Sequence, residues 1–161
     1  METRVNPPRT ADLVGGLLGV FGALVTILAC ALPFGHFSSD SGPVSPSIFH
    51  PESSDQLWYA GEPAAVIVMA IVGGLLVVFS RRGLVQISGA ATLVALGIQT
   101  FFFFVGFTGY GLSGGLDEVG IGSVVGLGAG LCLLAGGVIA FVSIAGRATP
   151  PPSGQGPGAI V

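Results

Sequence analysis

The chain contains no lysine, and only 8% of its 161 residues are charged. A soluble domain carries about a quarter charged residues, so this composition could not cover a water-facing surface. Lipid must therefore be the solvent for much of the chain, and we expect the bilayer as its main partner. The net charge of −3 and the lack of a basic stripe exclude nucleic acid as a partner.

Cysteine is almost absent, since only Cys30 and Cys132 occur and both lie in apolar segments. We interpret them as small packing residues. We expect no bridge between them, because Cys30 is near the end of its segment and Cys132 near the middle of its own. One alternative is that Ile27 to Cys30 form a bacterial lipoprotein signal, with Cys30 lipidated and three spans left after cleavage.

No catalytic motif is present, neither a nucleophile elbow nor a glycine-rich phosphate loop followed by lysine. We therefore expect a protein that is not an enzyme and has no cofactor. Histidines and acids that could hold a metal do occur between the apolar segments, but their spacing matches no compact motif, so we expect a solvated acidic face and no metal. These residues are His36, Asp40, His50, Glu52, Asp55, Glu62, Asp117 and Glu118.

Four long apolar segments predict an all-α fold, an integral membrane bundle of four transmembrane helices. The segments span about 13–34, 63–80, 84–107 and 120–145. They form one domain, 12–146, with outer loops at 35–62 and 108–119. A polar lead, 1–11, precedes the domain, and Asp12 is placed to cap the first helix. The tail, 147–161, is rich in Pro and Gly and is predicted to be disordered.

Every basic residue lies in the lead, in the middle connection or after the last span, and the outer loops have none. The topology determinants are Arg4, Arg9, Arg81, Arg82 and Arg147. Because arginine and lysine are enriched in cytoplasmic loops, both termini are predicted to be cytoplasmic. The use of arginine alone and the 28 glycines favour a bacterial plasma membrane. Trp58, Tyr59 and Tyr110 are expected to anchor the outer interface.

Small residues recur every four positions in the first and last spans. In lipid such rows let helices approach closely, and we expect them to pack the four spans together. The alternative is that one row contacts another subunit. The rows contain Gly15, Gly19 and Ala23 in the first span, and Gly122, Gly126 and Gly130, with a second row of Gly128, Cys132, Gly136 and Ala140, in the last.

Gln99 and Thr100 are the most polar pair deep inside a span. We interpret them as interhelical hydrogen-bonding groups that face the bundle interior. The alternative is a polar pathway for a solute or ion. The run Phe101–Phe104 follows at once and suits an aromatic belt, with a lipid or quinone-like ligand site as its alternative.

The outline, with a larger first outer loop that contains Trp58 and a smaller second loop, resembles claudin-type and tetraspanin-type proteins. The loops lack the paired cysteines of those families, so the resemblance implies a four-span outline and no function. We expect an accessory or scaffolding subunit of a plasma-membrane complex, partnered by a membrane protein or by copies of itself. The alternatives are a small transporter or channel component and, third, a membrane enzyme that uses the outer histidines.

Overall fold

The structure is a computed structural model that describes residues 10–39, 42–44, 47–48, 58–113 and 118–148. It contains four helices: α1 (Thr10–Ala31), α2 (Trp58–Phe79), α3 (Gly83–Ser113) and α4 (Ile121–Ala148). By length and composition, three described segments could cross a membrane, namely Thr10–Ala31, Gly83–Gly106 and Ile121–Arg147. In α2 the apolar helix Pro63–Phe79 is shorter. The predicted helical fold is therefore found with its four helices, three of which are long and apolar enough to span a membrane.

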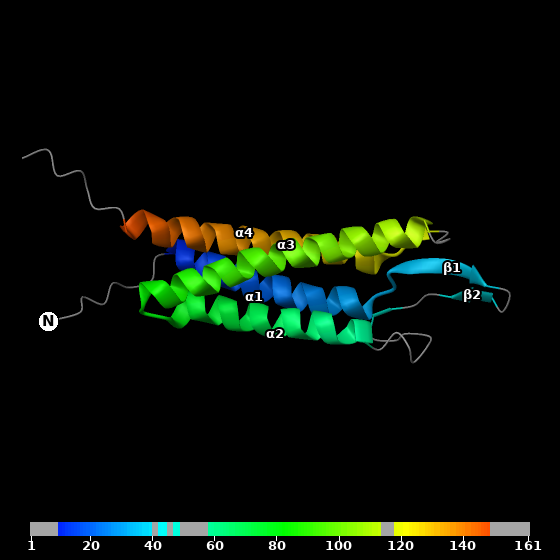
Figure 1. Cartoon of the computed structure of the whole chain (residues 1–161), viewed down its shortest axis with the longest axis horizontal. Helices are drawn as coiled ribbons and strands as arrows, with labels where there is room; N and C mark the ends of the chain where they lie inside the picture. The colour runs from blue at the N-terminus through cyan, green and yellow to red at the C-terminus, as the bar shows by residue number, and fades with distance from the viewer. Residues whose placement is uncertain (1–9, 40–41, 45–46, 49–57, 114–117, 149–161) are drawn as a thin grey trace, which may run out of the picture.

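The helices run antiparallel to their sequence neighbours and form a closed ring, α1–α2–α3–α4 (Figure 1). The α1–α4 and α3–α4 pairs contact each other most extensively, and α2–α3 least. The beginning of α1, the α2–α3 turn and the end of α4 share one end of the bundle. We call it the arginine end, because Arg81, Arg82 and Arg147 lie there.

Two helices, α2 and α3, extend furthest beyond their predicted limits. α3 ends at Ser113 and not at Phe107. Thr108 lies in the extra turns of the helix, where its Oγ1 donates to the Phe104 carbonyl four residues earlier, at 2.7 Å. α2 begins at Trp58 and contains Pro63. The helix tolerates this proline because it lies near the helix start and removes only one backbone N–H donor. Trp58 and Tyr59 therefore lie in the first turn of α2 and not in a loop.

A small antiparallel sheet lies at the opposite end, which we call the sheet end. It contains β1 (Gly35–Ser39), β2 (Gly42–Val44) and β3 (Glu118–Val119), in the order β2-β1-β3. Phe37 pairs with Val44, and His36 pairs with Glu118. The sequence analysis predicted no strands, because these short segments have no alternating pattern. Their pairing joins the first connecting segment to the one before α4.

Many small residues face the inside of the bundle, beside a few large ones such as Phe104 and Leu93, and many large apolar residues face outward. Gly15 and Gly136 touch across α1 and α4, since a Cβ on Gly15 would lie 2.7 Å from the Gly136 carbonyl oxygen. Leu17, Phe102 and Val142 are each more than half exposed. This arrangement suits an apolar solvent, in which close backbone packing replaces the burial of large side chains.

Candidate functional site

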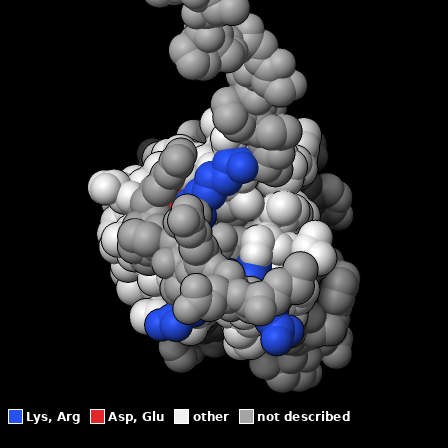
Figure 2. Space-filling view, turned by 90° about the vertical axis from the view of Figure 1, so that its left-hand side faces the viewer, with Lys and Arg blue, Asp and Glu red and all other residues white. Residues whose placement is uncertain are grey.

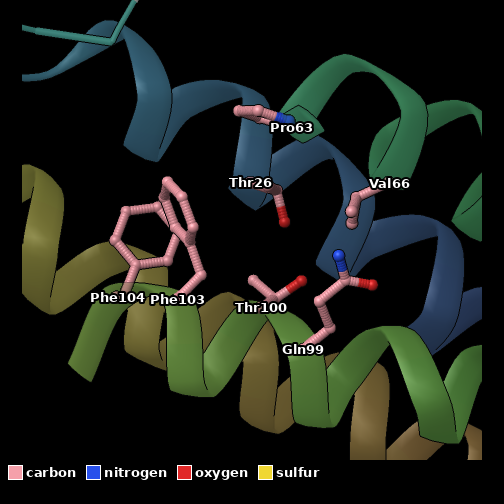
Figure 3. Close-up of a pocket in the computed structure, with 7 residues that line it drawn as sticks. All are labelled: Thr26, Pro63, Val66, Gln99, Thr100, Phe103 and Phe104. Carbon is pink, nitrogen blue, oxygen red and sulfur yellow. The ribbon is translucent and has the colours of Figure 1, made fainter. Parts of the chain in front are cut away.

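A small cavity lies between α1, α2 and α3, in the half of the bundle nearer the sheet (Figure 3). Its volume is about 20 Å³, which is room for one water molecule. Most of its lining is apolar. The lining residues are Thr26 from α1, Pro63 and Val66 from α2, and Gln99, Thr100, Phe103 and Phe104 from α3.

The predicted polar pair, Gln99 and Thr100, lines this cavity at two different depths. Thr100 is buried, with 3% of its surface exposed, whereas Gln99 is exposed at the cavity rim. Successive helical residues point about 100° apart, so the two side chains differ in exposure although both line the cavity. Figure 3 shows the side chains of both residues directed toward the space between α1, α2 and α3.

Thr26 faces the same cavity from α1, and the sequence analysis did not single it out. Its hydroxyl donates to the Gly22 carbonyl at 2.9 Å, and its residue is 2% exposed. Figure 3 shows the Thr26 and Thr100 side chains projecting into one space from opposite helices. The only signal in the sequence is a hydroxyl residue three positions after Ala23, the last member of the small-residue row, and this does not identify a cavity.

The arginine end carries the described basic residues, and Figure 2 shows their blue surfaces around the bundle axis. Arg81 and Arg82 are exposed. Arg147 forms an ion pair with Asp12, whose surface is 0% exposed. Asp12 was expected only as a helix cap, and its ion pair across the bundle was not predicted. Arg4 and Arg9 lie outside the described residues.

Most of the predicted small-residue rows lie in helix contacts within the chain. Ala23 is fully buried, and an added Cβ on the packed glycines would lie within 3 Å of another helix or connection. The added Cβ would meet Leu93 at Gly19 (2.7 Å), the Leu32 oxygen at Gly122 (2.7 Å), the Phe104 ring at Gly126, the Phe101 nitrogen at Gly130 (2.7 Å) and the Gly15 oxygen at Gly136 (2.6 Å). Gly128 is exposed, and a Cβ there would meet nothing within 4 Å.

At the sheet end, the segment that leaves α1 is bonded to the start of α4. Gly122 N–H donates to the Pro33 carbonyl at 2.8 Å, and Ser123 Oγ donates to the Phe34 carbonyl at 2.9 Å. Gly120 N–H also donates to the Phe34 carbonyl, at 2.8 Å. These bonds satisfy backbone donors that the first turn of a helix leaves without partners. Ser123 is 1% exposed, and the sequence analysis missed it.

The remaining predicted site residues are only partly described. Trp58, Tyr59 and Tyr110 lie in helices, but their side chains are outside the described part of the structure. Both cysteines are free, Cys30 buried and Cys132 half-buried. Among the described residues no group of three or more His, Cys, Asp or Glu could hold a metal ion. His36 is described and exposed, whereas His50, Asp40, Glu52, Asp55 and Asp117 lie outside the described residues.

The chain matches no protein-family model and no curated protein. Its function must therefore be inferred from the geometry above.

Proposed function

We propose that the chain is an integral membrane protein of a bacterial plasma membrane that crosses the bilayer four times. Three helices are long and apolar enough to cross. The apolar part of α2, 17 residues from Pro63 to Phe79, spans about 26 Å, close to the roughly 30 Å of hydrocarbon in a bilayer. The outward-facing large apolar side chains support the same conclusion, since lipid can cover them.

We propose further that the arginine end faces the cytoplasm and the sheet end faces outward. The exposed Arg81 and Arg82 lie at the arginine end, where α1 begins and α4 ends. Positive residues are retained on the cytoplasmic side during insertion. Both termini would then be cytoplasmic, and the β1–β3 pairing would lie outside.

Within that membrane, the protein acts as a non-enzymatic accessory or scaffolding subunit. The observation that carries this proposal is the closed interior of the bundle. Glycine contacts such as Gly15–Gly136 and Gly16–Gly74 bring helix backbones together. No Asp, Glu, Lys, Arg or His occurs in 13–31, 63–79, 83–113 or 121–146, whereas ion-coupled pathways usually need one. The outer faces are then the surfaces available to a partner.

The test is co-purification in native lipid particles. The tagged protein is extracted with its surrounding bilayer, and the proteins that accompany it are quantified by mass spectrometry. A membrane protein recovered in fixed stoichiometry supports the accessory role, and its activity names the process. Recovery of this chain alone, active by itself in a transport assay, would contradict that role.

A second candidate is a small transporter or channel component, alone or as a homo-oligomer. The observation that favours it is the cavity that Thr26, Gln99 and Thr100 line. The test is a Gln99→Cys variant in a background with Cys30 and Cys132 replaced by alanine. Reaction with a water-soluble thiol reagent supports a wet pathway, and a thiol that stays unreactive while a lipid-soluble reagent modifies it opposes one.

A further inference from the structure

Thr100 departs from the usual behaviour of threonine in a helix, where the hydroxyl often donates to the carbonyl four residues earlier. Other threonines of this bundle follow that rule: Thr26 bonds to Gly22 at 2.9 Å, Thr92 to Ser88 at 2.9 Å and Thr108 to Phe104 at 2.7 Å. The Thr100 hydroxyl, by contrast, makes no hydrogen bond to any described residue. It lies on the wall of the cavity.

The surroundings of this hydroxyl make an unpaired state unfavourable. Thr100 is 3% exposed, and Val66, Phe103 and Phe104 line the same space. A buried hydroxyl without a partner loses its hydrogen bonds to water and gains none in return. A ligand that could hydrogen-bond to Thr100 inside the cavity would therefore be stabilised there.

The size of the cavity and the groups around it define that ligand. About 20 Å³ exceeds the roughly 10–15 Å³ that one water molecule needs, and it is too small for a lipid headgroup or a metabolite. Thr26 already donates its proton to Gly22, so its oxygen is left as an acceptor. The Thr100 hydroxyl can both donate and accept.

We propose that this cavity is a binding site for one water molecule, held between Thr100 and Thr26. The water accepts a hydrogen bond from the Thr100 hydroxyl and donates one to the Thr26 oxygen, with the Gln99 amide at the rim. The site joins α1 to α3, which otherwise contact each other little across the ring. This inference goes beyond the proposed accessory role and does not depend on it.

The direct test is nuclear Overhauser spectroscopy of the full chain in lipid nanodiscs, with ¹³C-labelled methyl groups in a deuterated protein. Val66 lines the cavity and has no exchangeable side-chain proton. We expect a cross peak between the Val66 methyls and water, and none at the fully buried Val77. A cross peak from Val66 to lipid acyl protons, or no cross peak at all, would overturn the proposal.

Two variants separate a bound water from an empty cavity. Thr100→Val replaces the hydroxyl by a methyl group, and Thr100→Ser keeps the hydroxyl. With water bound, Thr100→Val loses the Val66 cross peak and lowers Tm, whereas Thr100→Ser retains the cross peak. In a dry cavity Thr100→Val would instead raise Tm, because it removes an unpaired polar group, and that result would contradict the proposal. Thr92→Val, which removes a hydroxyl outside the cavity, sets the reference shift in Tm.

Discussion

Asp12 in the first turn of α1 and Arg147 in the last turn of α4 form an ion pair at the arginine end of the bundle. Asp12 is fully buried, and the Arg147 side chain is 22% exposed. Because α1 begins where α4 ends, each charge also lies at the helix terminus whose dipole favours it. The pair thus joins the first helix of the bundle to the last.

Removal of this pair should destabilise the bundle. We expect Asp12→Asn to lower the free energy of unfolding by about 3 kcal/mol, because it leaves the partly buried Arg147 without its counter-charge. The measurement is denaturant unfolding in detergent micelles for Asp12→Asn, Arg147→Met and the double variant. If the two single effects simply add, the pair contributes no coupling energy, and this interpretation of the contact is wrong.

The contact between Gly15 and Gly136 should not tolerate even a methyl group. A Cβ on Gly136 would lie 2.6 Å from the Gly15 carbonyl oxygen, and that backbone cannot rotate away. We expect Gly136→Ala to cost about 1–3 kcal/mol of stability through overpacking. Gly128→Ala is the matched control on the same helix, because its Cβ meets nothing within 4 Å. Equal stability of the two variants would contradict the predicted close approach.

The hydroxyl of Ser123 should hold the exit of α1 against α4. Ser123→Ala removes its bond to the Phe34 carbonyl, and we expect a loss of about 1 kcal/mol. Amide hydrogen exchange should become faster at Gly120 and Gly122, which donate to the same segment. The exposed Ser88 provides the control variant, Ser88→Ala. Unchanged exchange at both amides would show that the hydroxyl does not hold this junction.

The proposed orientation predicts which residues an impermeant reagent can reach. In a chain without Cys30 and Cys132, a cysteine that replaces the exposed His36 should react with a membrane-impermeant maleimide in intact cells. A cysteine that replaces the exposed Arg81 should react only after lysis. The reverse pattern would place the arginine end outside and refute the topology.

If a partner docks on the outer face of α4, a large side chain at Gly128 should block it. We expect Gly128→Leu to abolish co-purification of the partner while Tm changes little, because position 128 is exposed and a Cβ there would meet nothing within 4 Å. Gly146→Leu is the control, since Gly146 is also exposed with nothing within 4 Å and lies near the end of the helix. If the Gly128→Leu variant still co-purifies with the partner, the partner does not bind this face of α4.

The sequence predicted the helices well, because long apolar segments and small-residue rows are local patterns. The sheet and the ion pair could not be predicted from the sequence, because both join residues far apart in the chain. Nothing near Asp12 indicates Arg147, and the pairing of His36 with Glu118 depends on how the helices bring two connections together. The cavity likewise could not be predicted, because residues of three different helices form it, Thr26 and Thr100 among them.

The contacts at both ends of α4 also constrain how the chain is made. During synthesis α1 emerges first, yet Asp12 and the Pro33–Phe34 exit both have their partners in the α4 region, at Arg147 and at 120–123. The strand β1 likewise pairs with β3, which is synthesised later. A chain whose synthesis stops before α4 therefore has Asp12 without its Arg147 partner and β1 without β3. Such a chain is the form that membrane quality-control proteases are expected to remove, so the last helix would decide whether a nascent copy survives.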